Sequence, residues 1–139
     1  MSAEENLSKS RRFVEEFFNK GNLNAADEYL AANFVDHNPF PGQAPGLEGL
    51  KQGFSAFRQS FPDLHMTIDD LFAAGDKVVM RVTMKGTHKG SFMNMPPTGK
   101  QFNMEGMDIV RISGGKAVEH WGLMDALTMM QQLGAVPTA

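Results

Sequence analysis

The sequence predicts a single α+β domain: helices come first, a mostly antiparallel sheet follows, and one further helix comes last. Two spacings of apolar side chains support this prediction. Residues 7–61 carry them at helical intervals, whereas residues 65–123 carry them at alternate positions. With 139 residues the chain fits one domain, 1–139, that can bury a substantial core. We expect three N-terminal helices to pack on one face of a curved sheet, so that the domain forms a cone-shaped α+β barrel around a cavity.

Three helices are expected before the sheet. The first covers residues 7–18, and a short second helix ends at about Leu30. The third, residues 47–61, is the clearest, because its apolar residues form one stripe and Pro62 ends it. Between the second and third helices, the prolines and glycines in and after Asp36-His37-Asn38-Pro39 predict a loop.

Four strands are expected in the second half. They cover residues 65–72, 78–85, 101–112 and 116–123. A loop at residues 90–99 separates the second strand from the third, and a turn at Ser113-Gly114-Gly115 joins the last two. A final helix covers residues 125–133, with Asp125 as its N-cap and Gly134 just after its end.

Composition and charge exclude several classes of function. The chain has no cysteine, which rules out disulfides and thiolate chemistry. Its net charge is −3 and no cluster of Lys or Arg is present, so nucleic acid and anionic membranes are not expected partners. No apolar run reaches the roughly 18 residues of a membrane span, and the N-terminus lacks a secretory signal, so we expect a cytoplasmic protein. The four histidines lack metal-binding spacing and no phosphate-binding glycine motif occurs, so no metal or cofactor is expected.

Methionine and phenylalanine are both unusually frequent, with eleven of each beside one Trp and one Tyr. Methionine is flexible and polarizable, so it fills irregular space in a core and equally suits the wall of an adaptable apolar pocket. Both interpretations are open at this stage, and they are compatible with each other.

The predicted strand at residues 101–112 has one apolar face, and that face carries a single carboxylate. Alternation places on it Phe102, Met104, Gly106, Asp108, Val110 and Ile112. An ionised carboxylate in apolar surroundings is costly, so Asp108 must find a partner, reach water or titrate with a raised pKa. Such a group is a candidate for acid–base chemistry. The alternatives are a purely structural basic partner and an outward orientation of this face.

His120 on the next strand is the candidate partner of Asp108. A three-residue turn at 113–115 sets Asp108 opposite His120, whereas a two-residue turn sets it opposite Trp121. We favour the first register because it also pairs two valines across the hairpin. An Asp–His pair in an apolar cavity can transfer a proton, although a buried histidine with satisfied hydrogen bonds is the commoner case.

The remaining ionisable residues are less informative. Arg111 and Glu119, on the opposite face of the hairpin, are expected to form a structural ion pair. His37 lies in the loop before the third helix, where it could act as an acid, base or donor at the cavity mouth or be merely solvated. His65 and His88 have no neighbours of interest and are expected at the surface.

Several short segments, spread over nearly the whole chain, occur together in one known family. They are Phe61-Pro62-Asp63, Met95-Pro96-Pro97-Thr98-Gly99-Lys100, Asp108-Ile109-Val110-Arg111-Ile112, Gly115-Lys116, Glu119-His120, Asp125 and Gln132-Leu133-Gly134. In this order and spacing they resemble the SnoaL-like polyketide cyclases, or ester cyclases. The resemblance implies the cone-shaped fold of ketosteroid isomerase and nuclear transport factor. It also implies cofactor-free ring closure by intramolecular aldol condensation, in which acid–base residues remove a proton and stabilise the enolate.

The resemblance carries over to the site only in part. The cyclases place a catalytic Asp two residues after the histidine that matches His120, where this chain has Gly122. They also place a pocket histidine where this chain has Asp108. Either the proton-transfer group has moved across the hairpin to Asp108, or the cyclisation chemistry has been lost. The family's early polar pocket residue falls near Asp36 or His37.

The leading hypothesis is an acid–base enzyme of the cyclase, isomerase or aldolase kind, acting without a cofactor on a flat, mostly apolar carbonyl compound. Asp108 is the expected general base, His120 its partner or the acid, and His37 a donor at the cavity mouth. The expected substrate-binding residues are Phe40, Met104, Trp121 and Asp36.

Two other functions are considered. A non-catalytic ligand-binding or interaction module of the same fold is favoured by Gly122, because the family's catalytic Asp is missing there. Hydrolysis of an epoxide or ester needs a water between two carboxylates, and the sequence offers no clear second carboxylate on the pocket face. The outer face of the sheet carries Met107 and Ile109 among polar residues, which predicts a homodimer.

Overall fold

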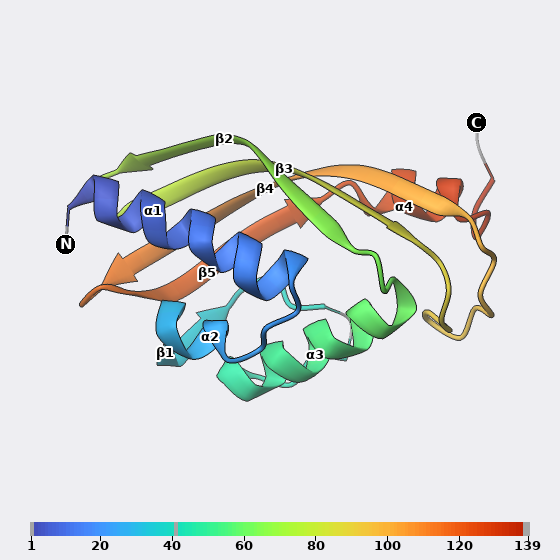
Figure 1. Ribbon diagram of the computed structural model, residues 1–139, viewed down its shortest axis with the longest axis horizontal. Coiled ribbons are helices and arrows are strands. Elements are labelled where there is room, and N and C mark those ends of the chain that lie inside the picture. Colours follow the sequence, from blue (N-terminus) through green and yellow to red (C-terminus); the bar gives the residue numbers. More distant parts are fainter. Residues whose placement is uncertain (1, 41, 138–139) are drawn as a thin grey trace.

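A five-stranded sheet carries helices on one face (Figure 1). The computed structural model describes residues 2–40 and 42–137. In chain order the elements are α1 (Ala3–Phe13), the π-helical η1 (Val14–Asn19), α2 (Ala25–Tyr29), β1 (Leu30–Asp36), α3 (Gly46–Ser60), β2 (His65–Ala74), β3 (Lys77–Thr87), β4 (Gln101–Ser113), β5 (Lys116–Met124) and α4 (Ala126–Gln132). The predicted α+β class is confirmed. Within the described residues, no helix is long and apolar enough to cross a membrane.

The first predicted helix is present, but its second half widens into η1 and ends before Gly21. Gly21 has a φ of +73°, which favours glycine. The guanidinium of Arg58 in α3 occupies the space that a side chain at Gly21 would need. From there Arg58 Nη1 donates to the carbonyl of Phe18 at 2.7 Å and so satisfies a free carbonyl at the end of the helix. Gly21 therefore both ends this helix and admits the side chain that ties it to α3.

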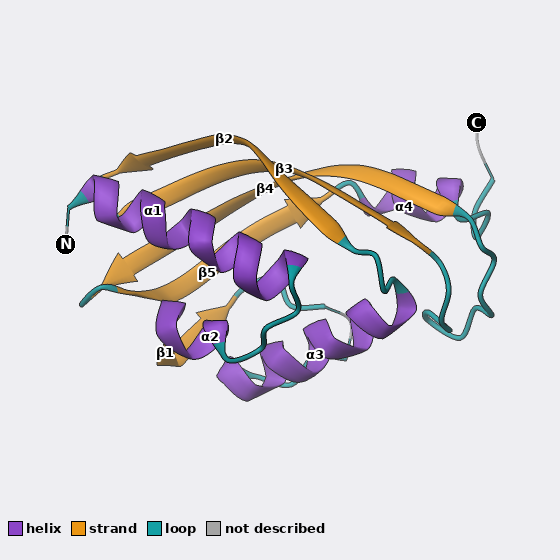
Figure 2. Cartoon of the chain, in the orientation of Figure 1, coloured by secondary structure: helices purple, strands orange, loops and turns teal. Residues whose placement is uncertain are grey.

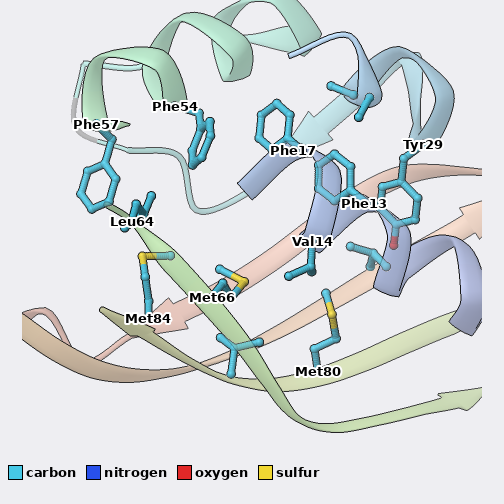
Figure 3. Close-up of a cluster of buried hydrophobic side chains, with 14 of the residues drawn as sticks. Phe13, Val14, Phe17, Tyr29, Phe54, Phe57, Leu64, Met66, Met80 and Met84 are labelled. Atoms are coloured by element: carbon cyan, nitrogen blue, oxygen red, sulfur yellow. The ribbon is translucent and has the colours of Figure 1, made fainter. Parts of the chain in front are cut away.

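The third predicted helix is confirmed as α3, and Phe54 of its apolar stripe packs against the first helix. Phe54 is fully buried and stacks on Phe17 of η1, with ring centroids 4.5 Å apart. Phe13 in turn stacks on Tyr29 at 4.5 Å. Figure 3 shows these rings together on the helical side of the core. This aromatic layer fixes the helices against the sheet.

The sheet is mixed, with the strand order β1-β5-β4-β3-β2, because it contains one strand that the sequence analysis missed. The predicted second helix ends at Tyr29, and β1 continues from Leu30 parallel to β5. Leu30 and Phe34 are its buried residues, a spacing of four that suits a helix as well as a strand. The other four strands confirm the prediction, and Figure 2 shows them arching over the helices.

The register of the β4–β5 hairpin differs from both predicted registers. Its turn consists of two glycines, residues 114–115, with φ of 61° and 81°, which is the geometry of a tight two-residue hairpin. A bulge then adds one residue to β5. As a result, Asp108 lies opposite Gly122 instead of opposite His120 or Trp121. The inward face of β4 is nevertheless the predicted one, because alternation within β4 does not depend on its partner.

His88 corrects a second prediction, because it is completely buried instead of lying at the surface. The loop after β3 folds back over it, and its Nδ1 lies 3.0 Å from Thr98 Oγ1. Its ring packs against Phe61, with centroids 5.5 Å apart. His65 is exposed, as predicted.

The final helix is confirmed as α4. Asp125 is its N-cap, since the carboxylate accepts from the backbone N–H of Thr128 at 3.2 Å. Gly134 follows the helix with a φ of +81°. Because α4 packs on β4, it covers one end of the sheet.

Candidate active site

A cavity of about 500 Å³ lies between the sheet and the helices. Its wall is mostly apolar, and eight of the ten methionines in the described residues line it. Figure 3 shows three of them, Met66, Met80 and Met84, projecting from β2 and β3 toward the aromatic side chains of the helices. Several of these methionines also belong to the buried core, so both interpretations of the methionine content hold. Such a wall can adapt to a large apolar ligand.

Within the part of the chain that the structure describes, five polar side chains interrupt this apolar wall: Tyr29, Asp36, Asn38, Asp108 and His120. Apart from Tyr29, they come from β1 and the loop after it, β4 and β5, which are neighbours in the sheet. The polar part of the cavity therefore lies on the β1-β5-β4 side, and the β2-β3 side is apolar.

His120 is held between two carboxylates. Its Nε2 lies 2.7 Å from Asp108 Oδ1, and its Nδ1 lies 2.8 Å from Asp36 Oδ1. The predicted Asp108–His120 contact is therefore present, although it runs diagonally across the hairpin. Both ring nitrogens face an oxygen, so the three groups form a chain of ion pairs. The described residues contain no cluster of His, Asp or Glu that could hold a metal ion.

The two carboxylates keep the imidazole protonated. Burial alone lowers the pKa of His120, but the hydrogen bonds and charges of Asp108 and Asp36 outweigh it and raise the pKa to about 9. For the acid Asp36, burial has the opposite effect and raises the pKa. The hydrogen bond and charge of His120 outweigh this effect, so the pKa of Asp36 lies below its usual value. At neutral pH the site therefore holds an imidazolium that donates one N–H to each carboxylate.

Gly122 leaves the space in which Asp108 and His120 meet. It lies opposite Asp108 in the ladder, and a Cβ on it would come within 2.7 Å of His120 Nε2 and closer still to Asp108 Oδ1. A side chain at position 122 would therefore force Asp108 and His120 to move from their present contact.

Two predicted site residues lie outside the cavity. His37 stacks on Trp121 with centroids 4.9 Å apart, and its Nε2 lies 2.8 Å from Glu119 Oε2. Glu119 also accepts from Arg111 Nε at 2.7 Å, which confirms that predicted ion pair. His37 and Trp121 directly follow inward-facing residues in the sequence, so alternation turns both to the outer face. Neither lines the cavity, and their expected places at its mouth and wall are corrected accordingly.

The other predicted residues do line the cavity. Phe40 and Met104 contribute to its apolar wall. Asp36, predicted to bind substrate, is also the second partner of His120 and only 9% exposed at its side chain. The expectation that the pocket lacks a second carboxylate is therefore wrong, and it failed because β1 was not foreseen.

Sequence reasoning missed two polar residues of the wall. Tyr29 is the only tyrosine and sits at the end of α2, where helical spacing gave it no special role. Its hydroxyl contacts Ser10 Oγ at 2.7 Å, and burial raises the pKa of Tyr29 to about 12. Asn38 precedes Pro39, and from the sequence this pair of residues indicated only a loop. The available signal for Asn38 was its place two residues after Asp36, the spacing of an Asx turn.

Comparisons with known proteins agree with this geometry. A model of the SnoaL-like polyketide cyclase family matches residues 8–133. Aklanonic acid methyl ester cyclase DnrD of Streptomyces peucetius is 29% identical over 108 residues, which cover 77% of this chain and 72% of that protein. Among solved structures, TsrD from Streptomyces laurentii has a TM-score of 0.89 at 29% identity, covering 98% of this chain and 99% of that one. IdmH from Streptomyces antibioticus has a TM-score of 0.81 at 35% identity, covering 93% and 98%.

The family match extends over most of the chain, and both solved structures share its fold over nearly their whole length. The motifs that carried the resemblance lie within the matched residues, apart from Gly134 directly after them. The chain therefore belongs to the SnoaL-like polyketide cyclase family.

Proposed function

We propose that this protein is an acid–base enzyme that acts, without a cofactor, on a flat, mostly apolar carbonyl compound of the polyketide kind. One observation carries the proposal: Asp108 stands in the wall of an apolar cavity with one oxygen 2.7 Å from the imidazolium of His120. Asp108 Oδ2 makes no hydrogen bond to any residue in 2–40 or 42–137, so it is free to accept a proton. The named relative DnrD, a methyl ester cyclase, supports a cyclase-type reaction.

The reaction we assign begins with Asp108 Oδ2 removing a proton from the carbon beside a substrate carbonyl. The electron pair of that C–H bond forms an enolate. The enolate carbon then attacks a second carbonyl carbon of the same molecule, so that a C–C bond forms and the second carbonyl oxygen becomes an alkoxide. The alkoxide takes the proton back from Asp108, which restores the carboxylate and yields the ring-closed alcohol.

His120 serves in this scheme as a positioning residue rather than as a free acid. Both of its N–H groups are already donated, one to Asp36 and one to Asp108. It therefore fixes the carboxylate of Asp108, and its positive charge offsets part of the negative charge of the two carboxylates. Asp36 in turn fixes the imidazole ring from the other side.

Asp108→Asn tests the proposal, because it keeps the shape of the side chain and removes the base. The measurement is deuterium incorporation beside the carbonyl of enolisable aromatic ketones in heavy water, followed by NMR, which requires no knowledge of the natural substrate. We expect the wild type to accelerate this exchange and Asp108→Asn to lose it by at least about 100-fold. Asp70→Asn is the matched control. Asp70 lies on the edge strand β2 and pairs there with Arg81 of β3, so this variant should leave exchange unchanged. Equal exchange in Asp108→Asn would refute the assignment.

The rival function is a non-catalytic binding module of the same fold. It is favoured by the mutual satisfaction of His120 and the two carboxylates, since the same chain of ion pairs would serve a purely structural role. The exchange experiment separates the two functions. A wild type that binds aromatic ketones tightly and never exceeds the buffer rate of exchange would establish the binding module.

A homodimer completes the proposal. Met107 on the outer face of β4 is 61% exposed, and Leu123, its partner across the β4–β5 ladder, is 75% exposed. Exposed apolar neighbours on a sheet face commonly pack against a second copy. Sedimentation should show a dimer at micromolar concentration, and a monomer at that concentration would end this part of the proposal.

A further inference from the structure

The loop after β1 places a side-chain amide in the cavity wall. The parallel ladder between β1 and β5 continues past Asp36, where the backbone N–H of His37 donates to the carbonyl of His120 at 2.9 Å. The next N–H of β5 in this direction belongs to Gly122, and it donates to the side-chain Oδ1 of Asn38 at 2.9 Å. The amide of Asn38 thus takes the place of a ladder carbonyl where the strand ends.

A second contact fixes Asn38 from its backbone. Its N–H donates to Asp36 Oδ1 at 3.0 Å, which forms an Asx turn. The same oxygen of Asp36 contacts His120 Nδ1 at 2.8 Å. The group that orients His120 therefore also holds the backbone of Asn38, whose side chain is bound to Gly122.

The orientation of the Asn38 amide follows from its partner. The backbone N–H of Gly122 needs an acceptor, so the oxygen of the amide must face it and the nitrogen must face away. Nδ2 carries two N–H groups, and neither is donated to a residue that the structure describes. Asn38 lines the cavity, as do Gly122 and Asp108, which lie opposite each other in the β4–β5 ladder. The amide bound to Gly122 thus adjoins the stretch of wall that carries Asp108.

The other polar side chains of the wall, as far as the structure describes it, have no free hydrogen-bond donor. Asp36 and Asp108 are acceptors, and both N–H groups of His120 are taken. Ser10 Oγ donates its single hydrogen to the carbonyl of Asn6 at 2.8 Å, so Tyr29 must donate its own hydrogen to Ser10. Among the five polar side chains that line this wall in residues 2–40 and 42–137, Asn38 alone retains a free donor.

We propose that Asn38 Nδ2 is the oxyanion donor of the active site. It donates to the substrate carbonyl oxygen while Asp108 Oδ2 removes the proton from the neighbouring carbon, so the bond strengthens as negative charge develops on that oxygen. This inference rests on the proposed function for its catalytic role, and its binding role can be measured independently of turnover. It names the substrate feature that the site recognises: a carbonyl oxygen beside an acidic C–H group, at the polar end of an apolar molecule.

The probe for the binding role is 2-naphthol, a flat aromatic whose ionised form carries its charge on one oxygen, like an enolate. Affinities for naphtholate and for neutral 2-methylnaphthalene are measured by fluorescence for the wild type, Asn38→Asp and Asn38→Ala. Asn38→Asp retains the acceptor for the Gly122 N–H and removes the donor, whereas Asn38→Ala removes the donor without adding charge. Asn33→Asp, on the exposed part of β1, is the control for added charge.

We expect both Asn38 variants to bind naphtholate at least about 10-fold more weakly, to bind 2-methylnaphthalene as the wild type does, and to lose about 100-fold in deuterium exchange. Asn33→Asp should match the wild type in all three measurements.

A loss of naphtholate affinity in Asn38→Asp without any loss in Asn38→Ala would identify charge repulsion and overturn the inference. Full exchange in both Asn38 variants, with exchange still dependent on Asp108, would overturn the inference and leave the proposed function standing. Loss of naphtholate affinity in both variants of a protein that catalyses no exchange would support the donor and refute the proposed function.

Discussion

Two chains of charged side chains lie back to back on the same part of the sheet, one on each face. On the inner face His120 lies between two acids, Asp36 and Asp108. On the outer face an acid, Glu119, lies between two basic side chains, those of His37 and Arg111. The central residues are neighbours in β5, so simple alternation turns one inward and the other outward.

The two chains have opposite charge patterns, and the residues at their ends also differ in burial. The Asp36 side chain is 9% exposed, whereas that of His37, the next residue, is 40% exposed. Hydrogen bonds from His37 and Arg111 lower the pKa of Glu119, a group that is already charged in water. Hydrogen bonds to Asp36 and Asp108 raise the pKa of His120 to about 9, which converts a neutral group into a cation. The same chemistry is thus a surface ion network on one face and a candidate proton-transfer device on the other.

Gly122→Asp should disrupt the inner chain most severely. The added side chain overlaps Asp108 and places a third carboxylate beside His120, so we expect the free energy of unfolding to fall by at least about 2 kcal/mol and deuterium exchange to fall by at least about 100-fold. Denaturant unfolding and the exchange assay measure these two effects. The double variant Asp108→His/Gly122→Asp has the pattern that the resemblance assigns to the cyclases, and it removes the repulsion between the carboxylates at positions 108 and 122. It should therefore recover part of the lost stability, and strictly additive losses would contradict this electrostatic coupling.

The pH dependence of stability should also separate the two chains. The pKa of His120 is raised from 6.5 to about 9, so its contribution is fully present below pH 6.5 and is lost as the pH rises through 9. The free energy of unfolding should fall by up to about 3 kcal/mol between these two pH values. Denaturant titrations at pH 6 and pH 10 measure the fall, which His120→Gln should abolish. His37→Gln, the matched change on the outer face, should retain it, and an equal response of the two variants would show that the inner chain is not distinct.

The inner face could be predicted from the sequence to the extent that it depends on one strand. Alternation along residues 101–112 assigned Asp108 to the pocket face, and this holds because the period of two does not depend on how the hairpin is paired. The contact with His120 was also predicted, but from a register that does not occur. The side chains of Asp108 and His120 meet diagonally because Gly122 leaves the space between them.

The remainder of the site depends on contacts that no local pattern encodes. Asp36 reaches His120 across 84 positions of sequence, through a parallel pairing of β1 that a four-residue apolar spacing concealed. The bulge in β5 leaves no trace in hydrophobicity. His88 is buried only because a loop of the chain folds back over it, so its isolated place in the sequence indicated a surface residue.

Glu119→Gln is the weakest perturbation and the sharpest test of the contrast between the two faces. It removes the charge at the centre of the outer chain while keeping the shape of the side chain, as Asp108→Asn does on the inner face. Ion pairs in contact with water contribute little, because the solvent and the entropy of long side chains offset the attraction. We expect the melting temperature to change by less than about 3 °C and the deuterium exchange rate to remain within about twofold of the wild type. Calorimetry and the exchange assay measure both. A loss of exchange comparable to that of Asp108→Asn would mean that the two chains are coupled through β5 and that the outer one also belongs to the active site.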